Sequence, residues 1–144
     1  MSDQSRLSIF LTRSWSRDWA ILLLRLWLGS MMVYHGWGKV FGNIDKFAEG
    51  IAKMGFPMPE FFAWSAALSE FGGGLLLIFG LFTRPAAMFV GITMIVAGFV
   101  RHLDDPFGKK ELSLTYLVLA LVILIAGPGK AALDRLLFNR SASN

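Results

Sequence analysis

The chain has 144 residues, of which 55% are hydrophobic and only 17% are charged, and its mean hydropathy is +0.56. A soluble domain of this length could hardly bury so much apolar surface, so the composition indicates one helical membrane domain. The net charge of +4 comes from basic residues scattered beside apolar runs, which favours anionic lipid headgroups over nucleic acid as partners. The absence of cysteine excludes disulfides, thiolate metal ligands and thiol redox chemistry.

Residues 1–18 form a polar tail without the apolar core and cleavage site of a secretory signal. On a helical wheel, Leu7, Leu11 and Trp15 fall on one face, while the arginines of the tail fall on another. This pattern predicts an amphipathic helix at the membrane surface, with a disordered basic tail as the alternative.

The first predicted span covers residues 19–37, with tryptophan at both ends, as membrane interfaces prefer. It contains one charged residue, Arg25, and His35 lies near its end. Small and polar residues share the helical face of Arg25, which we therefore expect to pack against other helices. That face consists of Arg25, Gly29, Met32, Gly36 and Lys39.

Residues 38–60 connect the first span to the second. Phe47, Ile51 and Met54 repeat at helical spacing before a stop at Gly55 and Pro57. The segment is predicted to form a short amphipathic helix over the end of the bundle. It is interpreted as a plain connector in preference to a lid, although loops of this length often carry function.

The second predicted span, residues 61–82, contains one carboxylate, Glu70, and three consecutive glycines at 72–74. Its length is about what a helix needs to cross roughly 30 Å of hydrocarbon. A carboxylate at this depth is costly, so Glu70 is predicted to face protein, water or a partner charge. The glycines beside it allow a neighbouring backbone to approach closely.

Residues 86–100 and 112–126 are the third and fourth predicted spans, and the fourth is shorter than a span requires. The fold class is predicted to be all-α, an integral membrane four-helix bundle with amphipathic interfacial segments at both ends. The domain organisation follows as a tail at 1–18, a bundle at 19–126, and a C-terminal amphipathic stub and tail at 127–144. The distribution of lysine and arginine slightly favours cytoplasmic termini.

Four polar residues in or beside the spans are candidate functional residues. Glu70, Arg25 and His35 are candidate catalytic residues, because a buried carboxyl group and an imidazole can exchange protons. Lys39 joins these three as a candidate cofactor-binding residue. Ideal helix geometry allows Glu70 to contact either His35 or Arg25. In the alternative interpretation, the buried charges only fix the packing of the bundle.

No metal site is predicted. His102, Asp104 and Asp105 are close in sequence, but Pro106 and Gly108 follow them, which is typical of a solvated turn.

Small and polar residues recur in a characteristic order along residues 19–136. They are Arg25, Gly29, His35, Gly36 and Lys39; Pro59, Glu70, Gly73, Gly74, Gly80 and Leu81; Thr83, Arg84, Pro85, Ala86 and Ala87; and Gly127, Pro128, Gly129, Leu133 and Asp134. Together they resemble the DoxX family. The resemblance implies a small four-helix protein of the bacterial cytoplasmic (inner) membrane, with relatives linked to quinones and oxidative stress, but it supplies no agreed catalytic residues.

The leading functional hypothesis is a membrane subunit or accessory of a quinone-linked oxidoreductase system that is not catalytic alone. Glu70, Arg25 and His35 are expected to line a polar pocket, with a quinone as the candidate cofactor and no covalently bound cofactor. The expected partners are the lipid bilayer and either other subunits of a membrane redox complex or further copies of the chain. The alternative is a non-enzymatic scaffold or assembly subunit. A solute carrier is disfavoured, because the sequence has no inverted repeat or broken helix.

Overall fold

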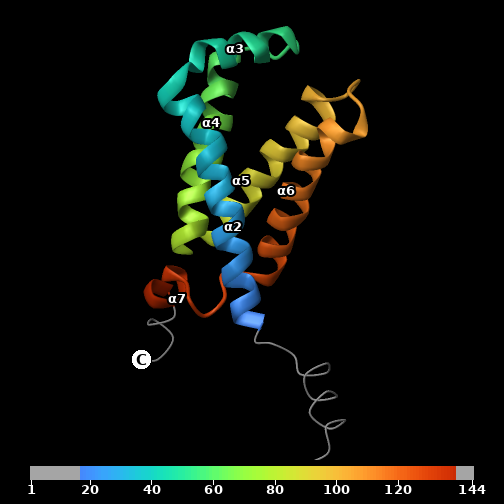
Figure 1. Cartoon of the computed structure of the whole chain (residues 1–144). Coiled ribbons are helices and arrows are strands. Elements are labelled where there is room, and N and C mark those ends of the chain that lie inside the picture. The colour runs from blue at the N-terminus through green and yellow to red at the C-terminus, as the bar shows by residue number, and fades with distance from the viewer. Residues whose placement is uncertain (1–16, 139–144) are drawn as a thin grey trace, which may run out of the picture.

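The computed structural model describes residues 17–138. All regular secondary structure in this part of the chain is helical, and turns join the helices (Figure 1). Two π-helical turns, η1 and η2, continue α2 and α5. The predicted all-α class is confirmed, whereas the amphipathic helix predicted for the N-terminal tail falls on residues outside the described range. The elements are α2 (Arg17–Trp37), η1 (Gly38–Gly42), α3 (Ile44–Lys53), α4 (Pro59–Phe79), α5 (Thr83–Val96), η2 (Ala97–Arg101), α6 (Phe107–Ala126) and α7 (Leu133–Phe138).

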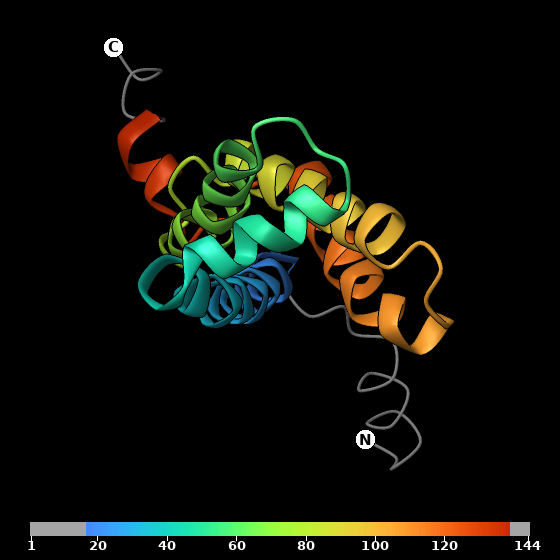
Figure 2. The same cartoon turned by 90° about the horizontal axis from the view of Figure 1, so that it is seen from above.

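The four long helices form two antiparallel pairs. Helix α2 packs on α4, α5 packs on α6, and contacts between α4 and α5 join the pairs. The pairs diverge toward the end where α3 lies, while α7 lies at the opposite end (Figure 1). Seen from above, α3 crosses the end of the α2–α4 pair (Figure 2). The predicted amphipathic helix over the end of the bundle is therefore present as α3, and its own residues Ala48 and Ile51 are buried.

Glycines bring α2 and α4 into close backbone contact. A Cβ atom added at Gly74 would lie 2.7 Å from the carbonyl oxygen of Gly29, and one added at Gly29 would lie 2.7 Å from that of Gly74. Neither helix can therefore carry a side chain at these positions without moving. The α2 face expected to pack against other helices is buried at Arg25, Gly29, Met32 and Gly36.

Helix α4 stops at Phe79, three residues before the end of the predicted second span at residue 82. Gly80 adopts a left-handed conformation with a φ of 66°, and its N–H bonds the carbonyl of Leu77 at 3.2 Å. The next N–H, from Leu81, bonds the carbonyl of Leu76 at 2.9 Å. This arrangement is a typical glycine-terminated helix end, and the remaining residues of the apolar run form the turn into α5.

Helix α6 begins at Phe107, five residues before the predicted start of the fourth span at residue 112. Its first turns contain Lys109, Lys110 and Glu111, which are good helix formers although they are too polar for a lipid core. The helix has 20 residues, but its apolar part still begins near residue 112, so the shortness of the fourth span stays a prediction.

Two helical segments in the described residues are long and apolar enough to cross a membrane, namely Pro59–Phe79 and Thr83–Arg101. Helix α2, with 21 residues, and α6, with 20 residues, have comparable lengths but contain more polar residues. All four long helices expose large apolar side chains on their outer faces, for example Leu23, Leu68, Ile92 and Ile125.

Candidate functional site

The carboxylate of Glu70 is buried beside the α3 end of the bundle and is paired with Lys39. Glu70, on α4, is only 3% exposed, and the ammonium group of Lys39, on η1, lies 2.5 Å from each of its two carboxylate oxygens. The same ammonium lies 4.8 Å from the centre of the Phe47 ring on α3. The pair therefore links three elements, and the lysine lies in a π-helical turn, a geometry that recurs at functional sites.

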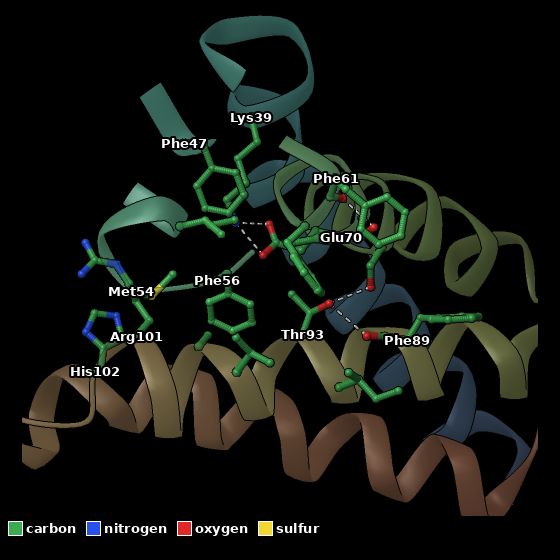
Figure 3. A pocket seen from close by; sticks show the side chains of 18 residues that line it. Lys39, Phe47, Met54, Phe56, Phe61, Glu70, Phe89, Thr93, Arg101 and His102 are labelled. Atoms are coloured by element: carbon green, nitrogen blue, oxygen red, sulfur yellow. Dashed lines mark hydrogen bonds and ion pairs between the residues drawn. The ribbon is translucent and has the colours of Figure 1, made fainter. Parts of the chain in front are cut away.

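A cavity of about 540 Å³ adjoins this ion pair and is lined mainly by residues of α3, α4, α5 and η2 (Figure 3). Its walls are mostly aromatic and aliphatic, and its volume is in the range of small-molecule sites in proteins. Besides the ion pair, the hydroxyl groups of Thr93 and Ser69 also line it, with Thr93 donating to Ser69 at 3.0 Å.

The two ends of the cavity differ in chemical character. Phe61 and Phe89 lie at one end, and both rings are also exposed on the outer surface of the helices (Figure 3). Met54, Arg101 and His102 lie at the other end (Figure 3). The cavity thus has an apolar end between α4 and α5 and a polar end beneath α3.

Arg25 lies elsewhere and does not line the cavity. It is 1% exposed, and its guanidinium donates to the carbonyls of Leu77 and Ile78 at the end of α4, at 3.0 and 3.3 Å. It also donates to the carbonyls of Pro128 and Ala131, the latter at 3.0 Å. These contacts favour the packing interpretation for Arg25, because the positive charge satisfies carbonyls at a helix C-terminus.

His35 does not line the cavity either. Its ring packs edge-to-face on Tyr116 of α6, with 5.8 Å between ring centres, and on its neighbour Tyr34. Within the described residues, no hydrogen bond or ion pair joins Glu70 to His35 or to Arg25. The expected pocket lined by Glu70, Arg25 and His35 together is thus not formed, and Lys39 is the residue that joins Glu70.

Lys39 is predicted from the sequence only as a candidate binding residue, and its pairing with Glu70 is not predicted. The signal was the helical face that Lys39 shares with Gly36, since Gly36 packs directly on the α4 backbone, where a Cβ would lie 2.5 Å from the nitrogen of Phe71. Phe71 is the neighbour of Glu70 in the sequence. Lys39 lies about one helical turn after Gly36 on the same face. It is therefore close to the part of α4 that contains Glu70.

Comparison with known proteins agrees with the family resemblance of the sequence. The family model described as DoxX matches residues 20–103, which include most of α2, the elements from η1 to η2, and both members of the ion pair. The chain belongs to the DoxX family. The inner membrane protein YqjF of Escherichia coli is 32% identical over 126 residues, covering 83% of this chain and 93% of YqjF.

Two further relatives of this DoxX protein have informative names. The inner membrane protein YphA of Escherichia coli is 30% identical over 131 residues, covering 83% of this chain and 91% of YphA. A Bacillus subtilis protein named "Putative oxidoreductase CatD" is 31% identical over 118 residues, covering 81% of this chain and 86% of CatD. No solved structure matches the chain.

The predicted location in the bacterial inner membrane is confirmed by the names of YqjF and YphA, together with the two segments that are long and apolar enough to cross a bilayer.

Proposed function

We propose that this DoxX protein is a four-span subunit or accessory of a quinone-linked oxidoreductase system and that it binds a quinone beside the Lys39–Glu70 pair. The observation that carries the proposal is the apolar cavity of about 540 Å³ with a buried ion pair on its wall. Few polar groups in a mostly apolar cavity are typical of sites that orient a lipophilic ring. The proposed link to an oxidoreductase is supported by the name of the relative CatD.

Four spans are supported by the lengths and surfaces of the helices. Helices α2 and α6 have 21 and 20 residues, close to the 21 residues of α4. They lie beside the two segments that are long and apolar enough to cross a membrane. The one fully buried cation within them, Arg25, is satisfied by carbonyl oxygens. The charged residues of α6, Lys109 to Glu111, lie in its first turns, where they reach the membrane interface.

The two charged groups have complementary roles toward such a ligand. The ammonium of Lys39 donates hydrogen bonds and is suited to a quinone carbonyl oxygen, whereas the carboxylate of Glu70 accepts and can hold a proton from a hydroxyl group. A bound quinone supplies two-electron, two-proton chemistry. The surrounding rings of Phe47 and Phe56 exclude water and strengthen both contacts.

The test is the quinone content of the protein purified from native membranes in a mild detergent. Wild type should carry a quinone identifiable by mass spectrometry, and Glu70→Gln should retain roughly 10- to 100-fold less, as expected for the loss of a charge-assisted contact. Glu60→Gln is the matched control, because Glu60 is exposed in the first turn of the same helix.

Thermal unfolding in the same detergent verifies that each variant is folded. Retention of quinone by folded Glu70→Gln would contradict the proposal. A stoichiometric protein partner without quinone would instead support a scaffold, the alternative function, and a lone chain with only phospholipid would contradict both.

A further inference from the structure

A second, smaller cavity of about 290 Å³ lies between α3 and η2 and is strongly cationic. We call it the cationic groove, and its charged residues are Lys46, Glu49, Lys53 and Arg101. Three positive charges thus face one carboxylate. Within residues 17–138, none of these four side chains forms an ion pair or a hydrogen bond. The groove therefore carries an uncompensated positive charge.

The cationic groove is continuous with apolar surface. Met54 and Arg101 line both the groove and the large cavity, so the polar compartment borders the apolar one. Figure 3 shows both residues at the polar end of the large cavity, away from Phe61 and Phe89. A free inorganic anion would use only the cations, whereas an anion with an attached chain would also contact Met54.

The position of α3 places the groove at the height of lipid headgroups. The helix crosses the end of the bundle (Figure 2). Its residues Phe47 and Ile51 line the large cavity, whereas Lys46 and Lys53 are exposed. An amphipathic helix at the end of membrane-spanning helices lies in the interface, where phospholipid phosphates are concentrated.

We propose that the cationic groove binds the phosphate of an anionic phospholipid from the surrounding bilayer, with the start of an acyl chain against Met54. Arg101 and the two lysines supply the donors for the phosphate oxygens. A zwitterionic lipid should bind less tightly, because the net positive charge of the groove repels the cationic group of its headgroup. The site is distinct from the Lys39–Glu70 pair and does not depend on quinone binding.

The test is native mass spectrometry of the delipidated full-length protein titrated with dioleoyl phosphatidylglycerol, dioleoyl phosphatidylcholine or inorganic phosphate. Wild type should bind a first phosphatidylglycerol more tightly than phosphatidylcholine. The double variant Lys46→Ala/Lys53→Ala should weaken phosphatidylglycerol binding about 25-fold, at about 5-fold for each cation near the membrane surface.

The matched control is Arg84→Ala/Arg135→Ala, which removes two exposed cations at the opposite end of the bundle and should leave the affinity unchanged. The lysine variant should also retain its quinone, which separates this proposal from the preceding one. Equal binding of both lipids, or equal losses in the two double variants, would overturn the proposal. Binding of inorganic phosphate as tightly as phosphatidylglycerol would also overturn it, since it would identify an adventitious anion site.

Discussion

The buried charged side chains have different kinds of partner at the two ends of the bundle. At the end near α7, which we call the closed end, Arg25 reaches carbonyls of α4 and of the segment after α6. There the carboxylate of Asp134 also accepts from the N–H groups of Phe82 and Thr83, at 2.6 and 2.9 Å. At the α3 end, the helix pairs diverge (Figure 1). There the buried Glu70 pairs with one cation among the described residues, Lys39, beside a cavity.

The difference teaches that a charged residue within a span is not by itself evidence of function. Arg25 and Glu70 are almost equally buried, but Arg25 donates four hydrogen bonds to backbone carbonyls that are part of the fold. Glu70 instead borders space that a ligand can occupy. We therefore expect substitutions at the closed end to change stability and substitutions at the α3 end to change binding.

The largest effect on stability is expected from Arg25→Met. The substitution removes the Arg25 donors from carbonyls at the end of α4 and in the segment 128–131, at about 1–3 kcal/mol for each of these groups that is left unsatisfied away from water. The free energy of unfolding, measured by denaturant titration in detergent, should fall by about 3 kcal/mol or more. Arg84→Met is the control, because Arg84 is exposed, and it should change the value by no more than about 0.5 kcal/mol.

Equal stability of these two variants would show that the carbonyl contacts of Arg25 are dispensable and would remove the distinction between the ends. Arg25→Lys should restore only part of the loss, since one ammonium group cannot reach all the carbonyls that the planar guanidinium spans.

A smaller effect is expected at the contact between α2 and α4. A Cβ atom at Gly74 would lie 2.7 Å from the Gly29 oxygen and 2.8 Å from the Val33 nitrogen, so Gly74→Ala must push the two backbones apart. The expected loss is about 1–3 kcal/mol of unfolding free energy, as for other overpacked sites. A loss of this size would also show that α2 and α4 are closely packed, whereas the two helix pairs diverge toward α3.

Gly72 provides the matched control in the same helix, because nothing lies within 4 Å of a Cβ added there. Gly72→Ala should be neutral or stabilising by up to about 1 kcal/mol, since alanine favours a helix more than glycine does. If both alanine variants behaved alike, the close approach of the two helices would not limit stability.

Much of the fold could be predicted from the sequence because apolar periodicity and glycine position are local signals. The face of Arg25 and Gly29, the amphipathic helix around Ile51 and the packing role of Gly74 all follow from a 3.6-residue repeat. The start of α6 was missed, because lysines ended the apolar run without ending the helix.

The candidate site was predicted less well, because its geometry depends on contacts that no local pattern encodes. The carbonyl acceptors of Arg25 lie as far away as Ala131 and belong to the backbone, which the sequence does not display. The pairing of Lys39 depends on a π-helical turn, and the cavity depends on the divergence of two helix pairs. Neither feature changes the hydropathy pattern. Glu70 could therefore be predicted as a candidate site residue, whereas its pairing with Lys39 could not.

The smallest effect is expected in the turn after η2, where charges at the α3 end are paired in contact with solvent. Asp105 accepts from His102 at 2.7 Å and from Lys109 at 3.0 Å, and these hydrogen bonds, that of His102 first, hold the pKa of the Asp105 carboxyl below its ordinary value. Because this pKa is lower in the folded protein than in the unfolded chain, ionised Asp105 stabilises the turn at neutral pH. That contribution is lost as the pH falls through the folded-state pKa.

Carbon-detected NMR titration of Asp105 in detergent measures this shift directly. His102→Ala should move the midpoint upward toward the ordinary aspartate value, and Lys109→Ala should move it upward by less. Lys110→Ala is the control and should leave the midpoint in place, because the Lys110 ammonium donates to the carbonyl of Leu103 at 2.6 Å rather than to Asp105. An unchanged midpoint in His102→Ala would mean that the turn is not held by this pair. Because the group is in contact with solvent, high salt should weaken the Lys109 contribution, whereas the buried contacts of Arg25 at the closed end should be screened much less.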